Sequence, residues 1–129
     1  MKYLTNIEYL NLGYNNIAKI SAVVNMKKLN RLYINRNKVD DISGIRNLDS
    51  LDYLDATDNQ ICDISELQYL SNINLIGLSG NKIEDISPLV SNSHLGKSVY
   101  LYLGNNPLNE KSIKEYIPAL VKRGVNVYY

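Results

Sequence analysis

The sequence predicts an α/β repeat protein, a solenoid whose coils each add one strand to a shared parallel sheet. Three observations lead to this prediction. An apolar frame recurs at a nearly constant interval, an asparagine stands at the same point of each copy, and the chain after residue 108 follows a different pattern. We therefore expect about five repeats in residues 1–108 and a helix-strand cap of the same domain in residues 109–129.

The frame is L-x-x-L-x-L-x-x-N-x-I, with related apolar residues allowed at the leucine positions. Four copies begin at Ile7, Leu29, Leu51 and Ile73, and a shortened fifth begins at Leu101. Their asparagines are spaced by 22, 22, 22 and then 25 residues. They are Asn15, Asn37, Asn59, Asn81 and Asn106. Five copies in one frame indicate stacking, because a single coil cannot bury its own apolar edge.

Each part of the frame has a structural reason. The L-x-L element alternates with a period of two, as in a strand that buries two side chains and exposes the one between them. The asparagine follows where the chain turns away, so its amide is expected to bond backbone groups that have no sheet partner. Stacked coils would align these residues as a structural asparagine ladder. The Asp-Ile-Ser segments 41–43, 63–65 and 85–87 predict short capped turns, 3₁₀ or extended, on the return path.

The unit L-x-x-L-x-L-x-x-N-x-I-x-D-I-S-x-L resembles the 22-residue leucine-rich repeats of bacterial internalin-like proteins, over roughly residues 4–108. This resemblance implies a right-handed curved solenoid, with a parallel sheet on the concave face and short turns on the convex face. It also implies binding of other proteins, and it brings no catalytic residues. The first repeat departs from the pattern, because Lys19 stands where later repeats have aspartate and no helical amino-terminal cap is evident.

The C-terminal segment predicts a helix followed by a strand. Ser112 and Glu115 have the spacing of a capping box, and Pro118 should bend the helix or divide it at Ile117. Gly124 suits the end of a helix, and residues 125–129 alternate like a strand. This strand is expected to join the sheet as a sixth parallel strand and seal the stack.

The exposed strand positions and the strand exits form columns that the frame leaves free in residue type. Tyrosine dominates them, and it supplies rigid contact area together with a hydroxyl group. We therefore predict a protein-binding surface on the concave face. Its residues are Tyr9, Tyr14, Arg31, Tyr33, Arg36, Tyr53, Asp55, Asp58, Tyr100 and Tyr102. A plainer interpretation is that the aromatic neighbours merely stabilise adjacent strands.

Other chemistry has weaker support. Arg31 and Arg36 lie one strand from Tyr53 and Asp58, which suits a cation–π contact and a surface ion pair within the chain. Asp52, Asp55 and Asp58 lack the companions of a catalytic acid pair. The expected column of Asp41, Asp63 and Asp85 lacks the glycine-rich turns of calcium-binding repeats. We expect no enzyme activity, no cofactor and no metal site.

Composition limits the partners. A net charge of +1 gives no electrostatic case for nucleic acid, and no apolar run approaches the length of a membrane-spanning helix. One cysteine and one histidine exclude a disulfide framework and a zinc site made of several such residues. Charge is nevertheless uneven, at +5 for residues 1–48, −7 for 49–96 and +3 for 97–129.

The leading hypothesis is thus a non-enzymatic module that binds a partner protein through its concave sheet. A second hypothesis is a structural spacer of a larger bacterial surface protein, which associates weakly with itself through the uncapped first repeat. A carbohydrate-binding surface is a third, because tyrosines serve there too. Met1 fits either a native cytoplasmic start or the edge of a segment excised from a surface or secreted protein.

Overall fold

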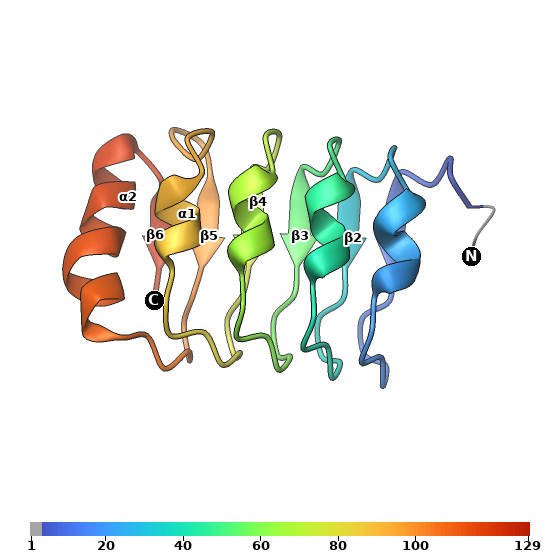
Figure 1. Cartoon of the computed structure of the whole chain (residues 1–129), viewed down its shortest axis with the longest axis horizontal. Coiled ribbons are helices and arrows are strands. Elements are labelled where there is room, and N and C mark those ends of the chain that lie inside the picture. The colour runs from blue at the N-terminus through green and yellow to red at the C-terminus, as the bar shows by residue number, and fades with distance from the viewer. Residues whose placement is uncertain (1–3) are drawn as a thin grey trace.

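The computed structural model describes residues 4–129, so Met1, where the expected repeat region begins, lies outside the described residues. Six parallel strands form one open sheet in the order of the sequence. They are β1 (Tyr9–Asn11), β2 (Arg31–Tyr33), β3 (Tyr53–Asp55), β4 (Leu75–Gly77), β5 (Tyr100–Tyr102) and β6 (Asn126–Tyr128). Figure 1 shows the strands side by side, with a row of helical segments in a second layer. The predicted solenoid is confirmed.

The second layer contains one short helical segment on each of the first four return paths. The predicted turns 41–43 and 63–65 lead into the 3₁₀ helices η2 (Ser43–Asn47) and η3 (Ser65–Tyr69), and the first return path has a 3₁₀ helix that was not predicted, η1 (Ser21–Asn25). The fourth, α1 (Ser87–Ser91), is an α-helical turn instead. Pro88 suits the start of an α-helix, and the Asn92 amide bonds the Pro88 carbonyl at 3.1 Å. Among residues 4–129, no helix combines the length and apolar character needed to cross a bilayer.

The core lies between the two layers and repeats from coil to coil. Leu32, Leu54, Ile76 and Leu101 occupy the same position in successive strands and are all fully buried. The return paths add Ile42, Ile64 and Ile86 from the other side. Each coil therefore covers the apolar side chains of its neighbours, which is the source of cohesion in a stacked-repeat fold.

The asparagines of the frame bond backbone groups of two coils at once. The Asn59 side-chain amide donates to the carbonyls of Ile34 and Ala56, at 2.9 and 3.1 Å. Its side-chain oxygen accepts the Val39 amide at 2.9 Å. Asn37, Asn81 and Asn106 make the equivalent bonds to their own and the preceding coil. Within the described residues, Asn15 bonds only carbonyls of its own coil, those of Leu12 and Gly13.

The C-terminal segment has the predicted order but a different helix start. A π-helical stretch, η4 (Ser112–Tyr116), leads directly into α2 (Ile117–Arg123). The predicted capping box is wrong, because Ser112 is fully buried and its hydroxyl donates to the Glu84 carbonyl and accepts the Ile86 amide. The residue that caps the helix is Asn109, whose side-chain oxygen accepts the Ser112 amide at 2.8 Å.

Pro118 does not interrupt the helix. The wider π-helical turn precedes it, and the change to α-helical geometry occurs at Ile117. Proline lacks an amide hydrogen, so a widened turn before it is a way to continue the helix without that bond. Gly124 then ends α2 with a φ of 99°, where an added Cβ would lie 2.9 Å from the Lys97 side chain.

Two sets of contacts that we did not predict hold the last coils together, and the Arg123 bonds among them attach the C-terminal segment. Asn92 is fully buried, and its amide donates to the carbonyls of Leu67 and Leu70, each at 2.8 Å. The Arg123 guanidinium donates to the carbonyls of Val90 and Asn92. β6 completes the connection by pairing with β5 along its whole length.

The asparagine contacts yield a stability prediction. Replacing Asn59 by Ala removes bonds to three buried backbone groups, so unfolding free energy should fall by about 1–3 kcal/mol. The matched control is Asn15→Ala, which removes only bonds within one exposed coil and should cost clearly less. Denaturant unfolding measured by circular dichroism tests both variants. Equal losses would contradict an inter-coil role for Asn59.

Candidate functional site

The register of the sheet places the exposed strand residues in two straight rows. One row contains Tyr9, Arg31, Tyr53, Leu75, Tyr100 and Asn126. The other contains Asn11, Tyr33, Asp55, Gly77, Tyr102 and Tyr128. We call these two rows, together with the strand exits, the concave face. Every residue of the predicted binding surface lies on it.

Five tyrosines of the concave face form two aromatic clusters. Tyr33 lies between Tyr9 and Tyr53, with ring centroids 5.3 and 4.9 Å away. At the other end Tyr102 stacks on Tyr128 at 4.8 Å with the rings nearly parallel. Tyr128 was missed in the predicted set, although its position in the alternating strand 125–129 was a sufficient signal. Burial, followed by the nearby Tyr33 and Asp55, raises the pKa of the Tyr53 hydroxyl.

A third group lies at the strand exits, where the backbone is left-handed. Tyr14, Arg36, Asp58, Gly80 and Asn105 all have φ between 53° and 68°. The Arg36 guanidinium lies 5.0 Å from the centre of the Tyr14 ring and 3.4 Å from Asp58. The expected ion pair between Arg36 and Asp58 is present. The described residues show no cation–π contact between Arg31 and Tyr53, and the one on this face joins Arg36 to Tyr14. Among the described residues Arg31 makes no ion pair.

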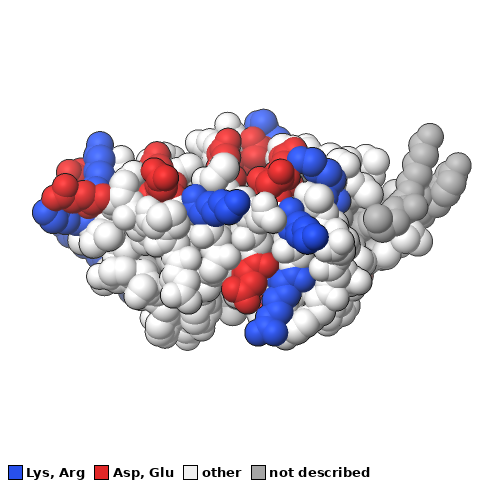
Figure 2. All heavy atoms as spheres, turned by 90° about the horizontal axis from the view of Figure 1, so that it is seen from below, with Lys and Arg blue, Asp and Glu red and all other residues white. Residues whose placement is uncertain are grey.

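Ion pairs join neighbouring coils. Lys19 pairs with Asp40 at 2.7 Å, and Arg46 pairs with Glu66 at 3.3 Å, each about one repeat apart. Figure 2 looks at the edge where the strands end and shows basic and acidic side chains next to one another. Bonding to Lys19 lowers the pKa of the Asp40 carboxyl.

The two aromatic clusters are separated by a hollow over β4. It has a volume of about 270 Å³ and is lined by Tyr53, Asp55, Thr57, Leu75, Gly77, Ser79 and Tyr102. One Asp55 oxygen accepts the Thr57 amide at 3.1 Å. The Asp52 carboxylate instead accepts a hydrogen bond from the Asn74 side-chain amide, and Asp58 forms an ion pair with Arg36. The three carboxylates thus have separate partners, and their arrangement does not resemble a catalytic acid pair.

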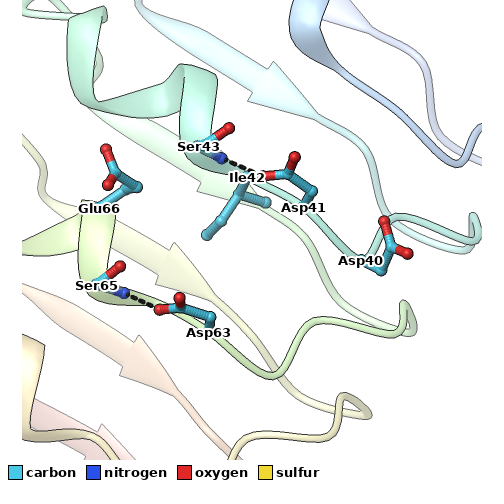
Figure 3. Close-up of a pocket in the computed structure, with 7 residues that line it drawn as sticks. All are labelled: Asp40, Asp41, Ile42, Ser43, Asp63, Ser65 and Glu66. Carbon is cyan, nitrogen blue, oxygen red and sulfur yellow. Dashed lines mark hydrogen bonds between the residues drawn. The ribbon is translucent and has the colours of Figure 1, made fainter.

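A second hollow lies among the acidic residues of the return paths. It is lined by Asp40, Asp41, Ile42, Ser43, Asp63, Ser65 and Glu66 and has a volume of about 240 Å³. Figure 3 shows that the Asp41 and Asp63 carboxylates turn toward the amides of Ser43 and Ser65, each at 2.8 Å. These aspartates cap their own helical turns. Within residues 4–129 no group of three His, Cys, Asp or Glu residues is placed to hold a metal ion.

A family model for "Leucine Rich repeats (2 copies)" matches residues 5–47 and again residues 27–69. The two matches together span just over half of the chain. The chain belongs to the leucine-rich repeat family. A comparison with curated protein sequences gives no match.

Solved structures extend this likeness beyond the matched repeats. Internalin C2 of Listeria monocytogenes has a TM-score of 0.78 at 28% identity, over 95% of this chain and 50% of its own. Another internalin of that species, inlF, has a TM-score of 0.75 at 33% identity, over 89% and 34%. The predicted resemblance to bacterial internalins is therefore confirmed.

A leucine-rich repeat protein of Leptospira interrogans shares the fold, with a TM-score of 0.70 at 22% identity over 99% of this chain and 44% of that one. The present leucine-rich repeat chain thus spans half or less of the length of each of these three structures. Its family fold is a scaffold for protein–protein interaction, and family members are in general not enzymes.

The Asp41 carboxylate predicts a loss of stability in acid. The Ser43 amide holds the pKa of the Asp41 carboxyl below its usual value. A lowered pKa in the folded state stabilises the protein above the titration range of an ordinary aspartate, and this contribution disappears as the pH falls through the folded-state value. Unfolding midpoints should therefore decrease from pH 7 toward pH 3.

The variant Asp41→Asn isolates this effect. Its amide oxygen can still accept the Ser43 bond, but it does not titrate. We expect the variant to be less stable than the wild type at pH 7 and to approach it at low pH, as measured by denaturant unfolding. A constant difference between the two proteins across this range would contradict the role assigned to the Asp41 carboxylate.

Proposed function

We propose that this leucine-rich repeat protein recognises a partner protein through its concave face, without catalysis. The observation that carries the proposal is the pair of tyrosine clusters. Tyr9, Tyr100 and Tyr102 are 54%, 42% and 36% exposed, at positions where the repeat frame prescribes no residue type. Such aromatic area on a rigid surface is typical of protein-binding sites.

The size of the face supports a contact that includes its rim. Six strands spaced by about 4.8 Å give a sheet about 25 Å wide. A stable interface takes about 800 Å² from each partner, so the strand-exit residues Tyr14, Arg36 and Asp58 would take part. The proposed binding surface consists of Tyr9, Tyr14, Arg31, Tyr33, Arg36, Tyr53, Asp55, Asp58, Tyr100 and Tyr102, with Tyr128 added.

Stacking within the sheet explains part of this aromatic content but not all of it. Tyr33 contacts two other rings and is half-buried, so it also stabilises adjacent strands. Tyr14 is 71% exposed and adopts a left-handed backbone, which disfavours a bulky side chain. Strain kept at an exposed residue favours a binding role over a packing role.

The test compares two sets of tyrosine variants. The triple variant Tyr9→Ala, Tyr33→Ala and Tyr100→Ala removes two exposed rings and one half-buried ring from the concave face. The control Tyr69→Ala removes an exposed ring beside Arg46 on the convex side. Proteins captured by the immobilised wild type are identified, purified and measured by surface plasmon resonance. The triple variant should bind at least tenfold more weakly, and the control should bind normally.

The same measurement can contradict the proposal. Circular dichroism of the triple variant shows whether it is folded, because loss of ring contacts is expected to cost some stability. A folded triple variant that binds every captured protein as tightly as the wild type would place recognition away from the concave face.

The first coil supports a second candidate, a structural segment that associates end to end. Leu4 is 46% exposed, and Leu10 and Leu12 are only partly buried, whereas their counterparts Leu32 and Ile34 are fully buried. An apolar surface of this kind is suited to contact with a further coil or a second copy of the chain.

Sedimentation velocity tests this candidate over a range of protein concentrations. The sedimentation coefficient should rise with concentration for the wild type and stay constant for Leu4→Glu, which places a charge on the exposed apolar end. A wild type that remains strictly monomeric at the highest concentration would contradict self-association through the first coil.

A further inference from the structure

The hollow over β4 exists because the aromatic rows are interrupted there. In the second row, Asp55 and Tyr102 flank Gly77 on the adjacent strands. Gly77 does not have a positive φ, so the backbone does not require glycine at this position. A Cβ here would lie 3.1 Å from an Asp55 carboxylate oxygen and 3.2 Å from the Thr57 hydroxyl. The glycine therefore leaves a carboxylate and a hydroxyl uncovered at the bottom of the hollow.

The uncovered carboxylate has no positive partner. Asp55 makes no ion pair among residues 4–129, and its carboxylate accepts a hydrogen bond from the Thr57 amide. Arg36, a cation at the nearby strand exits, is held between Asp58 and Tyr14. A half-buried acidic group without a counter-ion favours binding of a cation from outside the chain.

The walls suit a flat cation in particular. Tyr53 and Tyr102 belong to strands on either side of β4, which are about 10 Å apart at ordinary strand spacing. That gap admits one planar group between two aromatic rings. Thr57 and Ser79 add hydroxyl acceptors, and Leu75 offers apolar contact for an aliphatic stem. A guanidinium group has a planar face and several donors, whereas an ammonium group has neither the plane nor the fork.

We propose that the hollow formed by Tyr53, Asp55, Gly77 and Tyr102 binds an arginine side chain of the partner protein. The inference rests on the proposed function and specifies the chemistry of its central contact. The guanidinium would bond the Asp55 carboxylate and lie between the two tyrosine rings, with its methylene groups against Leu75. Arginine is common among the residues that dominate protein interfaces, so this pocket would act as the anchor of the concave face.

Nuclear magnetic resonance of the ¹⁵N-labelled full chain tests the proposal without a known partner. The probe is N-acetyl-arginine methylamide, and its neutral match is N-acetyl-citrulline methylamide, which keeps the shape and removes the charge. The arginine probe should shift the amide signals of Thr57, Gly77 and Ser79 and saturate in the millimolar range. The citrulline probe and the lysine analogue should each bind at least fivefold more weakly.

Three variants locate the effect. Asp55→Asn should weaken arginine binding at least fivefold. Gly77→Leu should abolish binding because its side chain fills the hollow. The equivalent positions of the neighbouring strands, Asp55 and Tyr102, carry side chains on the same kind of backbone. The matched control, Asp63→Asn, makes the same charge change on the convex side and should leave binding unchanged.

Several results would overturn the arginine assignment. These are no saturable shifts, shifts away from the hollow, equal binding of the citrulline or lysine probe, and full binding by Asp55→Asn. They are distinguishable from a failure of protein recognition itself. If the triple tyrosine variant loses its captured partner while the arginine probe does not bind, the concave face recognises proteins by another anchor and only the inference about the hollow is wrong.

Discussion

The asparagine bond between coils is the constraint on which the other features of this solenoid depend. Asn59 joins the carbonyls of Ile34 and Ala56 and also holds the Val39 amide, so it ties the end of one strand to the return path of the preceding coil. The chain turns sharply there, and its backbone groups have no sheet partner. One side chain satisfies three of them and so holds two successive coils in register. The 22-residue spacing is the length of chain in one coil, which brings each asparagine to the same point of the next coil.

Because the coils have nearly the same length, residues at equivalent positions form straight columns on the surface. Tyr9, Arg31 and Tyr53 align because each strand starts at the same point of its coil. Side chains in a column lie about 4.8 Å apart, so the identity of each residue affects its two neighbours. A single small residue then has a large effect, and Gly77 shows it by opening a hollow between the two tyrosine clusters. The shape and chemistry of the concave face therefore depend on the residues at strand positions where the repeat frame prescribes no residue type.

Most of the frame could be predicted from the sequence because its determinants are local and repeated. The strands, the register and the 3₁₀ turns follow from the spacing of leucines, asparagines and Asp-Ile-Ser segments. The errors fall where the repeat stops. Ser112 and Glu115 have the spacing of a capping box, but the Ser112 hydroxyl bonds backbone groups of the fourth coil. Asn109 caps the helix instead. The sequence also did not predict the side-chain partners of the arginines, because a long side chain can contact several neighbouring positions; Arg36, for example, lies over the Tyr14 ring.

The strand exits show how the frame and the proposed binding surface compete. The turn before each asparagine requires a left-handed residue, and Gly80 and Asn105 provide residue types that adopt it readily. Tyr14 and Arg36 occupy the same position at a cost of about 1–2 kcal/mol each, since their Cβ atoms are crowded there. Their mutual contact and the exposed ion pair with Asp58 return less than about 1 kcal/mol apiece. Local stability therefore does not account for these two residues, whereas contact with a partner along the rim of the concave face would.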